Sequence, residues 1–157
     1  MKRAIAVLAL GSMIGLLAGG CGGSKSEPPL TKAEYVKQMT AIGRSLSTSM
    51  SSLGAPTSPK SAATALSKVQ DDLRTAAKQL DDITPPDDVK DAHEKLTSGV
   101  NDFADGLDPI IEKLNNGDAK TAAAIAQLLS QVTTLKGFTE IQNAAASITK
   151  AGYKING

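Results

Sequence analysis

Aromatic residues and thiols are nearly absent from this chain. It has no tryptophan, two tyrosines, two phenylalanines and one cysteine. So few rings leave little surface on which a sugar or a nucleic-acid base could stack, and alanine, leucine, isoleucine and valine must fill the interior. A single cysteine cannot form a disulfide within the chain. A folded domain in this sequence is therefore stabilised by its core.

Excess charge of one sign is also missing, and histidine is scarce. Lys and Arg number 17 against 16 Asp and Glu, a formal net charge of +1, which gives no electrostatic attraction to nucleic acid. His93 is the only histidine. No second histidine can serve a serine nucleophile, and the sequence has neither a G-x-S-x-G turn nor a phosphate-binding glycine loop. We therefore expect a protein that is not an enzyme, with no cofactor, no metal ion and no nucleic-acid partner.

The sequence also lacks the alternating patterns and hairpin turns of β-strands. Apolar residues recur instead at steps of three and four within four segments, which run from Thr31 to Leu53, from Ser58 to Ile83, from Asp87 to Leu114 and from Asp118 to Gly152. Short turns join the segments, so neighbouring helices must run in opposite directions. The pattern predicts an all-α fold, an antiparallel up-and-down four-helix bundle.

Capping and helix-breaking residues set the ends of these segments. Thr31 begins a capping box, and Ser58 followed by proline is typical of a helix start. Pro109 should kink or split the third segment near Asp108. Asp118 is predicted to cap the last segment, whose apolar stripe changes phase at Gly137. We expect a bend there, or a break that gives a fifth helix.

The N-terminus has the outline of a secretory signal peptide. Lys2 and Arg3 precede an uncharged apolar run, AIAVLALGSMIGLL, at residues 4–17. This run is shorter than the roughly 20 residues of a membrane-spanning helix, and glycine and serine dilute it. We expect it to be removed rather than to remain as a transmembrane anchor.

Cys21 directly follows the small residues at which such a signal is cut. The stretch resembles the lipobox of bacterial lipoproteins, a Leu-Ala/Ser-Gly/Ala-Cys pattern. Gly19 and Gly20 match its small positions, whereas Ala18 stands where leucine is usual. The resemblance implies that the Cys21 sulfur receives a diacylglyceryl group and that cleavage falls between Gly20 and Cys21. The residues leave one alternative open, an incidental thiol beside an ordinary cleavage site.

A lipidated Cys21 would hold the protein at the extracytoplasmic face of the cell membrane. Two or more acyl chains anchor firmly, because each buried methylene contributes about 0.8 kcal/mol. The chain then divides into a signal peptide at 1–20, a lipidated cysteine with a flexible tether at 21–30, and a helical domain at 31–157. The tether after the cysteine, GGSKSEPPL, could span about 30 Å if fully extended. Loss of residues 1–20 removes Lys2 and Arg3 and brings the formal net charge to −1.

His93 stands at an apolar stripe position, which has two interpretations. In the simpler one the ring packs at the edge of the core and one nitrogen is hydrogen-bonded. The sharper one is a ligand contact, such as haem iron held by His93 together with Met39 or Met50. No C-x-x-C-H attachment sequence is present, and HEKLT has Thr97 where a zinc-protease motif needs its second histidine. We favour the structural role.

Aspartates gather around the turn between the second and third segments. Their spacing lacks the D-x-D-x-D-G order of a calcium loop. Three of them fit the first turn of the next helix, where negative charge complements the helix dipole. We interpret the group as a solvated acidic tip; its members are Asp81, Asp82, Asp87, Asp88 and Asp91.

Two stretches behind the glycine-rich lipobox carry a family resemblance. They are LTKAEYVKQM at residues 30–39 and ITPPDDVKDAHEKL at residues 83–96. Together they resemble small helical lipoproteins of actinobacteria, which commonly have an L-T/S-K-A-E-Y/F opening and a P-P-x-x-x-x-x-A-H segment. The resemblance implies an envelope location and a helical architecture, and it implies no activity. Many relatives have a cysteine in the first helix, which this chain lacks.

Two functions fit these observations. The first is a non-enzymatic binding or adaptor module of the cell envelope, whose partner is another envelope protein or the cell wall. The second is a small-ligand carrier or sensor with a cavity between the helices near Gly43, Gly99, Gly106 and His93. Small residues at these places could leave space, although close helix packing is the plainer interpretation.

Overall fold

The computed structural model describes residues 28–51 and 56–155, which fold into helices joined by turns. Neither of these ranges contains a strand, which confirms the predicted all-α class. The elements are α1 (Lys32–Ser51), α2 (Pro59–Asp81), the 3₁₀ helix η1 (Asp87–Val89), α3 (Lys90–Gly106), α4 (Asp108–Asn115), α5 (Ala122–Ser130), the 3₁₀ helix η2 (Gln131–Thr134) and α6 (Lys136–Lys150). Gly20 and Cys21 lie outside the described residues, so cleavage and lipidation there stay predictions.

The starts of α1 and α2 follow the predicted capping chemistry. The Thr31 N–H donates to Glu34 Oε2 at 3.0 Å, and the Glu34 N–H donates to Thr31 Oγ1 at 3.4 Å. These reciprocal bonds satisfy N–H groups that have no partner inside the helix. In α2 the Ser58 side chain accepts from the Ser61 N–H at 3.2 Å, and Pro59 occupies the first turn. Both capping predictions are confirmed.

The third predicted segment splits at its proline, as expected. α3 ends at Gly106, and α4 begins at Asp108 with Pro109 in its first turn. Proline cannot donate to the preceding turn, but its fixed φ suits the start of a new helix. The buried amide of Gln70 on α2 bridges this joint, because its Nε2 donates to the Ala104 carbonyl and to Asp108 Oδ1, both at 2.7 Å.

The predicted cap of the last segment is wrong. Thr121, not Asp118, caps α5, and its side chain accepts from the Ala124 N–H at 3.2 Å. The Asp118 N–H instead donates to the Lys113 carbonyl, beside Gly117 at φ +76°. Glycine readily takes this left-handed conformation at the end of a helix. Asp118 therefore belongs to the end of α4.

The last segment is broken into α5 and α6, and the break lies just before the predicted position. η2 and the extended residue Leu135 separate the two helices, whereas Gly137 lies in the first turn of α6. Gly152 ends α6 instead of continuing its apolar stripe, since its φ is +87° and the Tyr153 N–H donates back to the Ile148 carbonyl at 3.2 Å.

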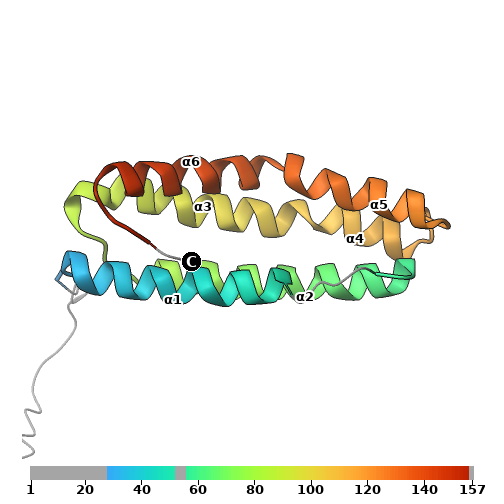
Figure 1. Cartoon of the computed structure of the whole chain (residues 1–157), viewed down its shortest axis with the longest axis horizontal. Helices are drawn as coiled ribbons and strands as arrows, with labels where there is room; N and C mark the ends of the chain where they lie inside the picture. The colour runs from blue at the N-terminus through green and yellow to red at the C-terminus, as the bar shows by residue number, and fades with distance from the viewer. Residues whose placement is uncertain (1–27, 52–55, 156–157) are drawn as a thin grey trace, which may run out of the picture.

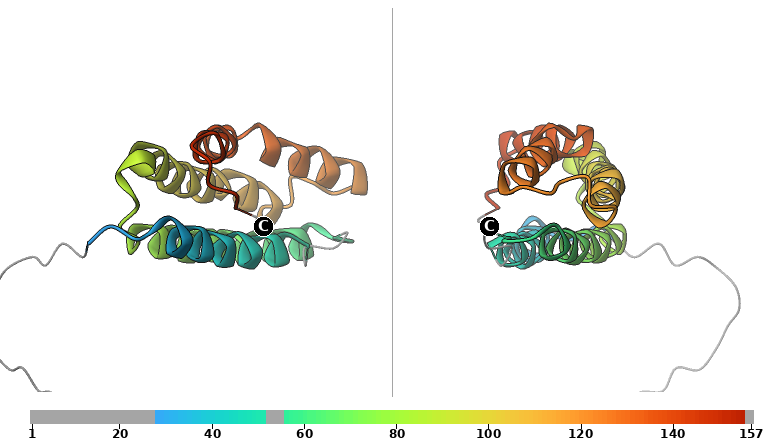
Figure 2. Two further views of the ribbon diagram at one scale, coloured as in Figure 1. Left: turned by 60° about the vertical axis from the view of Figure 1, so that its left-hand side comes forward. Right: turned by 90° about the vertical axis from the view of Figure 1, so that its right-hand side faces the viewer.

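The helices form two layers (Figures 1 and 2). One layer holds α1 and α2, and the other holds α3 with α4 and α6 with α5. Helix contacts run from α1 to α2, from α2 to α3 and α4, and from α3 to α6. On the remaining side α6 faces α1, and the C-terminal segment descends between them (Figure 2).

The core between the layers is almost entirely aliphatic, as the composition predicts. Its fully buried large side chains are Tyr35, Leu80, Val100, Leu107, Leu114 and Ile148. At one end of the core the Leu30 N–H donates to the Thr84 carbonyl at 2.9 Å. The turn between α2 and α3 therefore lies beside Leu30, just before the start of α1.

Candidate functional site

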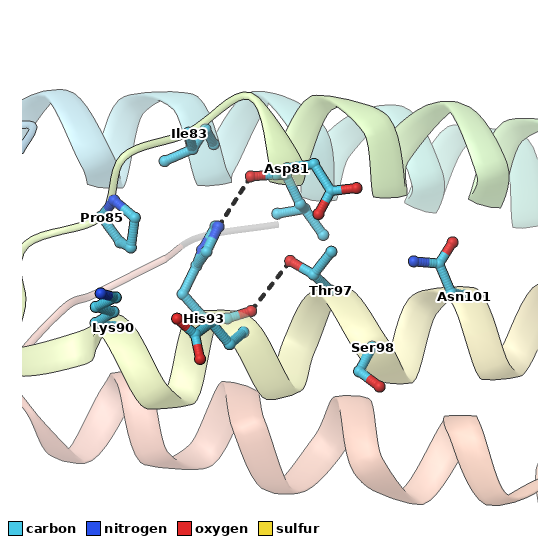
Figure 3. A pocket seen from close by; sticks show the side chains of 10 residues that line it. Asp81, Ile83, Pro85, Lys90, His93, Thr97, Ser98 and Asn101 are labelled. Carbon is cyan, nitrogen blue, oxygen red and sulfur yellow. Dashed lines mark hydrogen bonds between the residues drawn. The ribbon is translucent and has the colours of Figure 1, made fainter. Parts of the chain in front are cut away.

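A polar cleft lies between the end of α2 and the first turns of α3 (Figure 3). It has a volume of about 480 Å³, and Asp81, Lys90 and Asn101 are among the residues that line it. His93 forms part of its wall, but the ring points across to the α2 backbone (Figure 3). The backbone carbonyl of His93 accepts from Thr97 Oγ1 at 3.1 Å.

Both ring nitrogens of His93 are hydrogen-bonded inside the domain. Nε2 lies 2.9 Å from the Leu80 carbonyl oxygen, and Nδ1 lies 3.1 Å from the Tyr35 hydroxyl. A carbonyl only accepts, so the proton must be on Nε2, and Nδ1 accepts from Tyr35. The sequence predicted one such bond at the edge of the core; the structure has two, at a ring that is 4% exposed.

These surroundings favour neutral His93. Burial of the ring lowers its pKa below the ordinary value, and this effect exceeds the opposing influence of the Leu80 carbonyl and of Asp81 and Glu94. Burial and the proximity of Tyr153 raise the pKa of Tyr35 to about 12. Tyr35 and His93 therefore form a neutral, hydrogen-bonded pair that joins α1 to α3.

A second set of contacts ties the C-terminal segment to the same end of the domain. The buried Tyr153 ring packs edge-on against Tyr35, with ring centroids 5.4 Å apart, and its hydroxyl donates to Asp88 Oδ1 at 2.6 Å. Lys32 Nζ lies 4.5 Å from the Tyr153 ring centroid, within the range of a cation–π contact. The hydrogen bond to Asp88 raises the pKa of Tyr153 to about 12.

An apolar cleft of about 220 Å³ lies where α6 faces α1. Both helices line its sides, and α2 and α3 contribute residues from beneath. Of all the side chains that line it, Thr149 has the only polar group; the others are Met39, Ile42, Gly43, Leu46, Leu80, Leu96, Val100, Ile141, Ala145, Ile148 and Ile155. Leu46, Ile141 and Ile155 are only partly buried and remain accessible from outside.

The two candidate ligand residues line different clefts. Met39 lines the apolar cleft, whereas His93 lines the polar one and directs both ring nitrogens to protein groups. A ligand bond from His93 would have to displace Tyr35 or Leu80. The geometry gives no support to shared ligation of haem iron by these two residues.

The glycines proposed to border a cavity divide into two groups. Gly43 does line the apolar cleft. Gly99 packs against α6 instead, since a Cβ there would lie 3.0 Å from Glu140 Cβ and 3.0 Å from the Ile141 nitrogen. A Cβ on Gly106 would meet the Leu135 side chain at 3.2 Å. Gly99 and Gly106 therefore serve close packing and leave no space.

The aspartates at the turn after α2 have surroundings typical of a solvated tip. Asp81, Asp82, Asp87, Asp88 and Asp91 are all exposed, and Asp88 accepts the Tyr153 hydroxyl. Across residues 28–51 and 56–155, no three His, Cys, Asp or Glu side chains converge as a metal site would require.

Sequence reasoning missed most of the apolar cleft. Ile141, Ile148 and Leu46 stand at stripe positions that equally fit a closed core, because the spacing does not reveal how far apart two helices lie. Tyr153 was also missed as the residue that fixes the C-terminal segment. Its phenol, with an apolar body and a polar tip, was the available signal.

None of the helices in the described part of the chain is both long enough and apolar enough to cross a membrane. Comparison with protein-family models, with curated proteins and with solved structures found no match to this chain.

Proposed function

We propose that this protein is a lipid-anchored lipoprotein of the cell envelope, held at the extracytoplasmic face of the membrane by acyl chains on Cys21. Its helical domain acts as a non-enzymatic binding module. The domain is an antiparallel up-and-down four-helix bundle in which α3 with α4 and α5 with α6 each serve as one broken helix. The Leu30 N–H donates to the Thr84 carbonyl in the turn after α2. This contact supports a bundle whose α2–α3 end lies beside the tether and therefore toward the membrane.

The apolar cleft favours a small apolar ligand over a protein or cell-wall partner. A polar wall or a peptide offers hydrogen-bonding groups along its length, and the cleft has only the Thr149 hydroxyl to meet them. Small-ligand sites are concave and mostly apolar, with few polar groups. The carrier or sensor is therefore the leading form of the binding module, and the adaptor is the second.

Mass spectrometry of the protein extracted from its own membrane tests this function. The denatured protein is expected to start at Cys21 and to carry covalent acyl groups. Under native conditions it should carry additional mass that is lost on denaturation. A Cys21→Ser variant is the control for the covalent part, since it should carry no acyl group.

Two results would contradict the proposal. A denatured mass without acyl groups would remove the anchor and make this a secreted domain. A native mass equal to the denatured mass would remove the small-ligand carrier and leave the adaptor, whose partner should then be recovered by cross-linking in intact cells.

A further inference from the structure

We propose that the cleft between α1 and α6 binds the hydrocarbon chain of a single-chain lipid, such as a fatty acid, with the polar head outside. This assignment rests on the proposed function as a carrier and names the chemical class of its ligand.

The shape of the cleft suits a linear chain. Met39, Ile42 and Leu46 follow one face of α1 at helical spacing, and Ile141, Ala145 and Ile148 line it from α6. Seven residues of an α-helix span about 10 Å, so these rows border a narrow furrow along the helix axes. A volume of about 220 Å³ is small for a compact, drug-sized ligand but accommodates part of a thin chain.

The chemistry of the lining places the head group outside. Thr149, on the last turn of α6, is the one polar side chain in the lining, and it is exposed. No charged side chain among the residues that form the cleft could pair with a buried carboxylate, and burial of an unpaired charge is strongly unfavourable. A fatty acid can therefore enter only with its chain inside and its carboxylate in water.

The small volume of the cleft, about 220 Å³, favours one chain over two. A diacyl lipid would leave its second chain in water, where each exposed methylene lowers the affinity about fourfold. A single-chain lipid has a smaller loss, because only the part of its one chain beyond the furrow stays in water.

The position of the cleft puts it near a source of lipid. α1 begins at Lys32, where the tether ends, and Met39 lies about 10 Å farther along the helix. Cys21 to Leu30 extends over about 30 Å at most, so a domain on this tether stays close to the bilayer surface. Ile155, which follows the fixed residue Tyr153, lines the cleft from the C-terminal segment.

The test supplies palmitate that carries a mid-chain diazirine and a terminal alkyne to cells that make the full chain. After irradiation the protein is purified and digested with trypsin. Cross-links are expected in peptide 38–44 of α1 and in peptide 137–150 of α6, which contain the cleft residues. Peptide 121–136 is not a suitable control, because Leu129, Val132 and Thr133 line a second apolar cleft of about 210 Å³. Peptide 69–74 of α2, which lines neither apolar cleft, is the control and should show at least tenfold fewer.

Two variants on α6 distinguish binding in the cleft from non-specific labelling of apolar surface. Ala145→Trp should fill the cleft and reduce cross-linking of peptide 38–44 at least tenfold. Ala146→Trp adds the same ring at an exposed neighbour that does not line the cleft, and it should leave cross-linking unchanged. Circular dichroism of both variants checks that they fold. The distribution of cross-links among the peptides of the unmodified chain tests the assignment without any variant.

Equal labelling of all three peptides would overturn the assignment, as would labelling that Ala145→Trp does not reduce. Cross-linked adducts with the mass of a diacyl phospholipid would overturn the single-chain class. If native spectra retain a non-covalent ligand while palmitate does not label the cleft, the carrier function stands and only its ligand class is wrong.

Discussion

α6 packs against its two neighbours in opposite ways. Toward α3 the contact is as close as backbone allows, since a Cβ on Gly137 would lie 2.5 Å from the Gly99 carbonyl oxygen and would also overlap Phe103 N. Toward α1 the same helix presents aliphatic side chains across a cleft. Gly99 on α3 and Gly137 on α6 close the contact between these two helices, which we call the closed seam. The part of α6 that faces α1 has no glycine, and the contact there, the open seam, contains the cleft.

Specific contacts lie at one end of the open seam. Tyr35 reaches from α1 to His93 on α3, and Tyr153 bonds to Asp88 just after it leaves α6. These contacts hold α1 and the C-terminal segment to the start of α3, and they do not fill the cleft. A closed seam, stabilised by packing, and an open one, bordered at one end by polar contacts, should respond differently to substitution.

Gly137→Ala should lower the free energy of unfolding most, because it adds a methyl group where α3 and α6 are in backbone contact. The added methyl group meets the backbone of α3, which cannot move aside as a side chain could. Overpacking of this kind destabilises by about 3 kcal/mol or more. The free energy of unfolding, measured by urea denaturation, gives the loss directly.

Gly106→Ala is the matched control for this prediction. Its methyl group would meet only the side-chain carbons of Leu135, which can shift. The better helix propensity of alanine offsets part of the cost, so the net change should stay within about 1 kcal/mol. Similar losses in both variants would show that the α3–α6 seam is not closed by backbone contact.

Tyr35→Phe should have the next largest effect, because it removes a buried hydrogen bond that joins α1 to α3 at one end of the open seam. His93 Nδ1 would be left buried and without a donor, which costs about 1–3 kcal/mol. Tyr153→Phe is the comparison, since exposed Asp88 can bond to water instead and the loss should stay below about 1 kcal/mol. Chemical denaturation of both variants gives the order, and an equal or reversed order would contradict the buried role of His93.

The pH dependence of stability should isolate His93 further. Its pKa in the folded state is lowered by burial, so its contribution is fully present above the unfolded value of 6.5 and is lost as the pH falls below it. His93→Gln keeps a donor for Leu80 and an acceptor for Tyr35 but does not titrate. Between about pH 7 and pH 5 the unmodified chain should lose stability relative to this variant. Parallel curves of unfolding free energy against pH would contradict the prediction.

Much of the fold was predictable because its signals are local. Capping at Thr31 and Ser58 and the split at Pro109 depend on backbone groups within a few residues of each other. The cap at Asp118 failed for a related reason. The turn between α4 and α5 contains three residues suited to a helix end, Gly117, Asp118 and Thr121. The sequence does not show that Gly117 ends α4 and that Thr121 begins α5.

The candidate site was predicted less well because it depends on the distance between helices. Gly43, Gly99 and Gly106 look alike in sequence, yet only Gly43 lines a cleft. Whether a glycine closes a seam or borders a space is decided by the residue opposite, which lies 29 positions away for Gly106 and 41 for Gly99. The burial of His93 was expected, but its partner Tyr35 is also remote and went unpredicted.

Gly43→Ala should have the smallest effect and the opposite sign. Gly43 lies inside α1, where alanine favours the helix by up to about 1 kcal/mol, and it lines the cleft, so we expect the added methyl group to enter that space. The free energy of unfolding should therefore rise slightly, while cross-linking of palmitate to peptide 38–44 should fall as the furrow narrows. If Gly43→Ala instead destabilises as Gly137→Ala does, the seam between α1 and α6 is closed in solution, and no space remains there for a chain.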